Sequence, residues 1–200
     1  PRDGPAFRTV LSEEIVQADV GRISLTRENG EPETAYFLNT CHVGIGGEVA
    51  VQVSHSSKVL GGFASFLFGT LRALAIYKDK RMRLNIDGVE SEQIVKELII
   101  AKGQYDGGGM HVAPHARLDN GLFDIYVIGE VSFPDAIMSL PKLYRGRLDL
   151  RPDIVTYYQA RSISVNCDEK VYVSPHGELP GILPAHFDIL PQSLRVVRRA

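Results

Sequence analysis

Short runs of alternating or β-branched residues dominate the chain and are separated by Gly, Pro and Asn. In one such run Met82, Leu84 and Ile86 point to one side and Arg83 to the other, a period of two that is typical of a half-buried strand. The same pattern predicts strands at 22–26, 35–39, 82–86, 96–101, 123–128, 162–166, 171–174 and 194–197. The chain is therefore expected to be rich in β-structure.

Three segments have helical patterns instead. Ser12 is followed by two acidic residues, which predicts the N-cap and first turn of a short helix. Ser132 predicts the N-cap of another helix that runs towards Tyr144, and Pro141 is expected to break or kink it. Between them lies a longer helix whose apolar residues recur every three or four positions: Leu60, Phe63, Leu67, Leu71 and Leu74.

These elements do not alternate as β-α-β units, so a doubly wound parallel sheet is disfavoured. We expect a β-rich α+β fold, a β-sandwich or open barrel with a few packed helices. No repeat, low-complexity tract or internal linker divides residues 1–200, and this favours a single domain.

Composition and charge narrow the class of protein. Hydrophobic residues make up 44% of the chain and charged residues 23%, as in ordinary globular domains. The formal net charge of −2 argues against nucleic acid as a partner. Cys41 and Cys167 are too few for a disulfide scaffold. The apolar stretch 59–71 is shorter than the ~20 residues that span a bilayer. We expect a cytoplasmic protein, at most peripheral on a membrane; a homodimer is compatible with these features.

Three consecutive glycines, Gly107, Gly108 and Gly109, form the most unusual run. Such a run costs backbone entropy, which is accepted where the chain needs a positive φ or a close approach. One interpretation is a bulge or loop between strands, and the other is a backbone wall that contacts a bound substrate. The run is neither a GxGxxG before a helix nor a GxxxxGK[ST], so it is not a known phosphate-binding loop.

Two further turns could have chemical roles. Asn120-Gly121 between apolar runs predicts a type I′ hairpin turn, but Asp119 and Asn120 are also oxygen donors of the kind that Mg²⁺ or Ca²⁺ prefers. Glu178, after the strand 171–174, is either a solvated turn carboxylate or a general base.

The histidines and basic residues are weaker evidence for a functional site. Cys41 and His42 would face opposite sides of a strand, so zinc binding is disfavoured. A basic cluster after the long helix is either a solvated strand face or a site for anionic lipid headgroups: Lys78, Lys80, Arg81 and Arg83.

Together these motifs resemble the C-terminal half of the bacterial diacylglycerol kinase, YegS-like lipid kinase and sphingosine kinase family. The resemblance covers nearly the whole chain and is most specific in GGGM-x₃-P-x-A-x₃-N-G-L followed by a late Gly-Glu. The matching segments are 36–39, 44–46, 105–110, 113–116, 118–124, 143–146, 177–178 and 189–191.

The resemblance implies a β-sandwich domain of a two-domain kinase that phosphorylates a diacylglycerol- or sphingosine-like lipid at a membrane surface. It implies that Glu178 takes the proton of the lipid hydroxyl. It also implies a Mg²⁺ site made of the Asn120 side chain and the carbonyls of Arg117 and Leu122. ATP would be held by an N-terminal nucleotide-binding domain with a Gly-Gly-Asp-Gly-Thr loop. That loop does not occur in this chain, so the chain alone is expected to be inactive.

The chain departs from the family pattern at three positions. Asn120 stands where the family usually has Asp. His176 replaces the Asp of the family's Asp-Gly-Glu motif, and Lys102 replaces an Asn that is common at its position. These departures keep an alternative open, a non-catalytic lipid-binding or regulatory β-sandwich module. A third hypothesis is an NAD kinase-like enzyme, because such enzymes share the broad fold of the lipid kinases.

Overall fold

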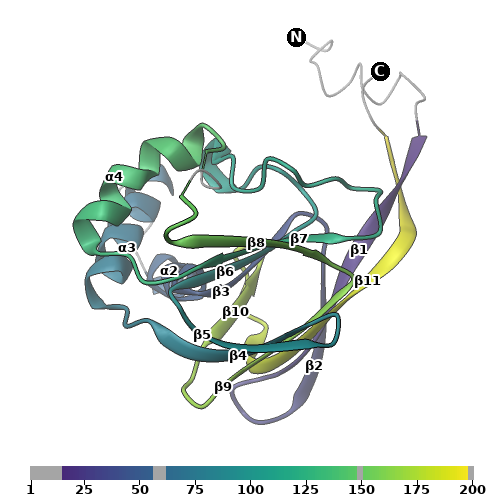
Figure 1. Ribbon diagram of the computed structural model, residues 1–200, viewed down its shortest axis with the longest axis horizontal. Helices are drawn as coiled ribbons and strands as arrows, with labels where there is room; N and C mark the ends of the chain where they lie inside the picture. The colour runs from purple at the N-terminus through teal and green to yellow at the C-terminus, as the bar shows by residue number, and fades with distance from the viewer. Residues whose placement is uncertain (1–14, 56–61, 148–150, 198–200) are drawn as a thin grey trace.

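Strand pairing joins eleven strands into one curled, antiparallel sheet (Figure 1). The computed structural model describes residues 15–55, 62–147 and 151–197. The strands are β1 (Ile15–Thr26), β2 (Pro32–Phe37), β3 (Thr40–Gly44), β4 (Lys80–Ile86), β5 (Val89–Val95), β6 (Glu97–Ala101), β7 (Phe123–Ile128), β8 (Val155–Ala160), β9 (Ser162–Cys167), β10 (Tyr172–Pro175) and β11 (Gly181–Val197).

The order across the sheet is β5-β4-β9-β11-β10-β3-β6-β7-β8, and β1 pairs with both β11 and β2. Because the sheet curls, most strands contribute to one shared core that includes Phe37, Leu84, Leu98, Phe123 and Phe187. This arrangement confirms the predicted β-sandwich with packed helices.

Strand β6 is buried on both faces, which explains its unbroken apolar sequence. Leu98 and Ile100 belong to the main core, whereas Ile99 and Ala101 belong to a second core beneath α4 (Phe133–Tyr144). A strand covered on both sides needs apolar residues at every position instead of alternate ones.

Three helices gather at one end of the sheet, and the long β1–β11 ribbon leads away from the other (Figure 1). They are α2 (Ile45–His55), α3 (Gly62–Ile76) and α4. Ser132 is the N-cap of α4, as predicted, and its side chain accepts a hydrogen bond from the Asp135 N–H. Within the described ranges, no helix is long and apolar enough to cross a bilayer.

Every predicted strand overlaps an observed one, but the boundaries differ. Strands β1 and β11 are much longer than predicted, and β3, β5 and β8 were not predicted. Helix α4 continues through Pro141 to Tyr144, so the expected break is absent there. The helix expected at Ser12 lies outside the described residues.

Helix α2 was also not predicted, because the glycines at its start suggest a loop. Instead they allow close packing. A Cβ on Gly46 would lie 2.7 Å from the Glu97 carboxylate, and one on Gly47 would lie 2.7 Å from the Tyr172 side chain. The first turn of α2 can therefore lie against β6 and β10 only if these positions lack side chains.

The prediction of a type I′ hairpin at Asn120-Gly121 is wrong. Gly121 has a φ of 67°, but Asn120 is not among the described non-glycine residues with positive φ. A two-residue turn of that type occurs instead at His176 (φ 51°) and Gly177 (φ 78°), where the Glu178 N–H donates to the Pro175 carbonyl.

Gly21 provides a test of the core packing. It pairs with Phe37 across β1 and β2, and a Cβ would lie 2.3 Å from the Phe37 ring. That ring is buried and stacks on Phe123, so it cannot move freely. We expect Gly21→Ala to lower the free energy of unfolding by about 1–3 kcal/mol in urea denaturation.

Gly129→Ala is the matched control, because its new Cβ would find only ordinary contacts at 3.7 Å. Its unfolding free energy should stay within about 0.5 kcal/mol of the parent chain. Equal unfolding midpoints for the two variants would show that the Phe37 ring tolerates a neighbour at position 21.

Candidate functional site

A cavity of about 500 Å³ lies between the three helices and the adjoining strands β3, β6 and β7. Its volume is within the usual range of small-molecule sites, roughly 300–1,000 Å³. Most of its wall is apolar, including Val49, Ala50, Leu74, Val112, Ile128 and Leu143. The cavity is therefore suited to an apolar ligand or to the apolar part of an amphipathic one.

A larger groove of about 780 Å³ crosses strands β4, β5, β9 and β11. Polar groups along it already have partners. Ser164 Oγ lies 2.8 Å from His186 Nδ1, and both residues line the groove. Arg83 also lines it and pairs with Asp168, which does not. This groove has less apolar character to offer a lipid than the cavity between the helices.

One wall of the cavity carries a cluster of three polar side chains, His42 from β3, Glu97 from β6 and Asp106 before the glycine run. His42 Nδ1 lies 2.6 Å from Glu97 Oε1, and Nε2 lies 2.5 Å from Asp106 Oδ2. The other Glu97 oxygen accepts a hydrogen bond from the Gly46 N–H in the first turn of α2. The cluster is thus held by β3, β6 and α2 together.

Burial lowers the pKa of His42, but hydrogen bonds and attraction to Asp106 and Glu97 outweigh it and raise the pKa to about 10. Burial raises the pKa of Asp106, but the contact with His42 outweighs it and lowers the pKa to about 2. At neutral pH an imidazolium between two carboxylates gives the cluster one net negative charge. The carboxylates keep lone pairs that can accept a hydrogen bond from a ligand hydroxyl.

The glycine run forms a short turn, η2 (Gly107–Gly109), in which Gly108 and Gly109 have positive φ. Gly107 lines the cavity, and a Cβ on Gly107 or Gly109 would meet nothing within 4 Å. Gly108 and Gly109 are not among the residues that line the cavity, so contact between the whole glycine run and a substrate stays a prediction.

The predicted base lies near the same cavity. His176 and Gly177 line its wall, and Glu178 follows them as an exposed residue. His176 Nε2 accepts a hydrogen bond from the Leu38 N–H at 3.1 Å, which fixes the start of the turn. The structure thus brings the glycine run and the turn that carries Glu178 to one cavity, although they are far apart in sequence.

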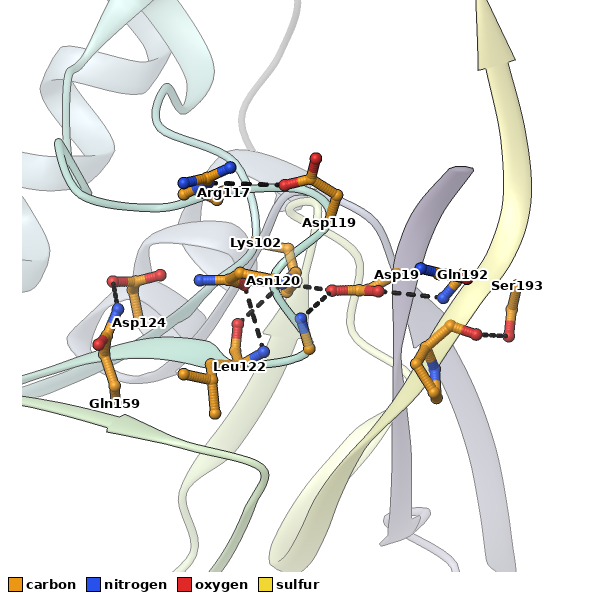
Figure 2. Close-up of polar contacts among 12 residues, drawn as sticks. Asp19, Lys102, Arg117, Asp119, Asn120, Leu122, Asp124, Gln159, Gln192 and Ser193 are labelled. Carbon is orange, nitrogen blue, oxygen red and sulfur yellow. Dashed lines mark hydrogen bonds and ion pairs between the residues drawn. The ribbon is translucent and has the colours of Figure 1, made fainter. Parts of the chain in front are cut away.

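The residues of the predicted metal site lie elsewhere. Arg117, Asn120 and Leu122 are not part of the cavity wall within the described chain. The Lys102 ammonium donates to Asn120 Oδ1 and to the Leu122 carbonyl, each at 2.8 Å (Figure 2). Asp119 is half-exposed and lies 3.6 Å from Arg117, away from these oxygens.

These contacts decide whether Mg²⁺ fits the turn. Two of its three expected ligands already bind a cation, and Mg²⁺ would need them at about 2.0–2.1 Å with further oxygens around it. Among the described residues, no group of three or more His, Cys, Asp or Glu side chains is arranged to hold a metal ion. With Lys102 in place, the donor set does not fit Mg²⁺.

The basic cluster after α3 is largely paired with acids. Arg81 pairs with Glu92 at 3.0 Å and Arg83 with Asp168 at 2.6 Å, and Lys80 contacts Glu169. Binding of lipid headgroups there would have to compete with these pairs.

Sequence reasoning missed the His42–Glu97–Asp106 cluster. It placed His42 opposite the side chain of Cys41, and this is confirmed because Cys41 is in the core while His42 faces the cavity. The available signal was Glu97, a charged residue at the start of a strand that is otherwise entirely apolar. Such a residue is rarely buried without a partner.

The cluster predicts a specific pH dependence. The pKa of His42 rises from 6.5 to about 10 on folding, so its contribution to stability is complete below pH 6.5 and disappears as the pH rises through about 10. We expect His42→Gln to remove this part of the alkaline loss of unfolding free energy in urea denaturation between pH 6.5 and 10.

The exposed His186 provides the control: His186→Gln should lose stability with pH as the parent chain does. A His42→Gln profile parallel to that of the parent chain would contradict a charged His42.

Known proteins resemble this chain over most of its length. A "Diacylglycerol kinase" from Bacillus subtilis is 23% identical over 192 residues, covering 96% of this chain and 60% of the relative. A "Probable lipid kinase YegS-like" from Shewanella frigidimarina is 27% identical over 184 residues, covering 91% of this chain and 57% of the relative. The chain thus spans about 60% of the length of such relatives.

Solved structures share the fold. A diacylglycerol kinase structure from Bacillus anthracis matches with a TM-score of 0.64 at 15% identity, covering 97% of this chain and 58% of its own. Another structure from that organism matches with a TM-score of 0.71 at 18% identity. Residues 39–198 match the model of the YegS C-terminal NAD kinase beta sandwich-like domain, and the chain belongs to this family.

Proposed function

We propose that this chain is the lipid-side domain of an ATP-dependent lipid kinase that transfers the γ-phosphoryl group to a lipid hydroxyl. One observation carries the proposal. An apolar cavity has a charged cluster in its wall and is bordered by both the glycine run and the turn that precedes Glu178. An amphipathic lipid combines an apolar chain and a hydroxyl in the same way.

In this proposal the acyl chain lies among the apolar side chains from α2, α3 and α4, and the polar head lies towards His42, Glu97 and Asp106. The carboxylates accept hydrogen bonds from the head and so orient it. Orienting the acceptor is a large part of catalysis here, because phosphoryl transfer depends mainly on positioning and electrostatics.

Glu178 is the proposed general base. The lipid hydroxyl oxygen forms a bond to the γ-phosphorus, the bond from that phosphorus to the bridging oxygen breaks, and ADP leaves. The hydroxyl proton passes to the Glu178 carboxylate, which requires a separation of about 3 Å once substrate is bound. ATP with its Mg²⁺ is held by a nucleotide-binding domain outside this chain. Its loop would meet the lipid at the exposed glycine run.

We also propose that the helical end of the domain docks on a membrane. Large apolar side chains are exposed on α3 and α4, two of the three helices that line the cavity: Phe68 (62%), Ile76 (54%), Phe133 (45%), Met138 (74%) and Tyr144 (41%). Exposed apolar surface of this kind can mark a site of interaction with a membrane or a protein. Docking there would place the cavity next to the lipid it receives.

A cavity-filling variant tests the lipid site. Ala136 lines the cavity from α4, so Ala136→Trp should occupy the space for the acyl chain. We expect binding of a soluble short-chain diacylglycerol to weaken at least ten-fold, about 1.4 kcal/mol, in calorimetry.

Met138→Trp on the same helix is the control, because Met138 is exposed and not part of the cavity wall. A soluble lipid is chosen so that membrane docking does not enter the measurement. Unchanged affinity in Ala136→Trp would place the lipid elsewhere.

The catalytic proposal depends on Glu178. In a protein that joins this chain to a nucleotide-binding domain, Glu178→Gln should reduce turnover by roughly 10²–10⁴-fold and leave lipid affinity nearly unchanged. The measurement is the rate of phosphate transfer from labelled ATP to the lipid.

Glu31→Gln, at another exposed turn carboxylate, should retain the parent rate. If Glu178→Gln also retains it, the base lies elsewhere. A joined protein that binds the lipid but transfers no phosphate would favour the alternative, a non-catalytic lipid-binding module.

A further inference from the structure

Lys102 is a fully buried cation with a complete set of partners. Its side chain has 0% exposure and follows the last residue of β6. The ammonium donates to three oxygens at 2.8 Å each: Asp19 Oδ2, Asn120 Oδ1 and the Leu122 carbonyl (Figure 2). An ammonium has three N–H donors, so this arrangement uses all of them.

The Asp19 carboxylate is equally buried and binds the surrounding backbone. Besides Lys102, it accepts hydrogen bonds from the Gly121 N–H at 2.7 Å and the Gln192 N–H at 3.0 Å (Figure 2). The Asp19 N–H donates to the Leu118 carbonyl at 2.7 Å. Burial raises the pKa of Asp19, but these hydrogen bonds outweigh it and lower the pKa below its ordinary value.

These contacts join four parts of the chain at one point. Asp19 lies in β1 where the pairing with β11 shifts register, and Gln192 lies opposite with a positive φ of 48°. Lys102 follows β6, and residues 118–122 form the turn before β7. The ion pair therefore fastens the turn to the β1–β11 ribbon.

A divalent cation bound in a turn of this kind would also hold the turn in place. It would bind Asn120 Oδ1 and the Leu122 carbonyl and so fix the turn, as the family resemblance implies for Mg²⁺. Here the charge is already balanced, since one buried carboxylate meets one buried ammonium. Adding Mg²⁺ would leave two uncompensated charges beside a fully buried ion pair, which is unfavourable.

We propose that the Lys102 ammonium is a built-in replacement for a structural divalent cation at this turn. The turn is fastened to the β1–β11 ribbon by an internal ion pair, so the fold neither binds nor needs Mg²⁺ there. This concerns the architecture of the chain and is independent of the proposed catalytic function. A nucleotide-bound Mg²⁺ in another domain is unaffected.

Thermal unfolding with and without Mg²⁺ tests the proposal on the 200-residue chain. The Tm of the parent chain should be the same in EDTA and in millimolar MgCl₂. Asn120→Asp alone should also show no response, because the Lys102 ammonium still occupies the site and pairs with the new carboxylate.

The double variant Lys102→Asn with Asn120→Asp removes the ammonium and supplies an acidic ligand. It should become dependent on Mg²⁺. Its Tm should rise by roughly 5–10 °C at a Mg²⁺ concentration about 100 times the dissociation constant. Folding only in the presence of Mg²⁺ would support the proposal equally.

Lys170→Asn combined with Asn120→Asp is the matched control, because it removes the same charge at an exposed position and keeps Lys102. It should not respond to Mg²⁺. The proposal fails if Mg²⁺ stabilises the parent chain. It also fails if the Lys102 double variant does not respond to Mg²⁺, or does not fold in either medium while Asn120→Asp folds.

Discussion

The buried ion pair between Lys102 and Asp19 is the interaction on which the rest of the structure most depends. It lies where the β1–β11 ribbon, the end of β6 and the turn before β7 meet. Removing one partner of such a pair typically costs about 3–5 kcal/mol, because the other charge stays buried without compensation. This is a large share of the roughly 5–15 kcal/mol that stabilises an ordinary domain. Asp19 lies at the register shift between β1 and β11 and accepts a hydrogen bond from Gln192, so the pairing of the two strands there depends on this ion pair.

The cavity combines apolar walls with a charged cluster whose members are paired. Helices α2, α3 and α4 cover one end of the sheet without filling it, and the space between them is mostly apolar. The His42–Glu97–Asp106 cluster is stable in that setting because each carboxylate has the imidazolium as a partner. An unpaired carboxylate there would be costly. The paired cluster instead provides a fixed negative charge beside apolar surface, a combination that suits an amphipathic ligand with a hydrogen-bonding head.

The strand pattern, the sandwich and the family could be predicted from sequence because they depend on local alternation and on short motifs such as 107–110 and 118–124. Helix α2 could not, since its glycines are required by side chains from β6 and β10 that are distant in sequence. The same holds for the candidate sites. Lys102 and Asn120 were each recognised as departures from the family pattern, but their mutual contact and the role of Asp19 exist only in three dimensions. The catalytic role of Glu178 remains a prediction.

Strand β6 connects the two charged sites and also keeps them apart. Glu97 at its start belongs to the cavity cluster, and Lys102 directly after its end belongs to the turn. At about 3.4 Å per residue these positions are roughly 17 Å apart. Four consecutive buried apolar residues, 98–101, lie between them. The proposed replacement of a metal ion by an ammonium at one end of β6 therefore leaves the cavity at the other end unchanged. Asn120 alone is thus weak support for a domain that has lost its chemistry. The choice between a kinase domain and a lipid-binding module depends instead on the residues around the cavity, and on Glu178 above all.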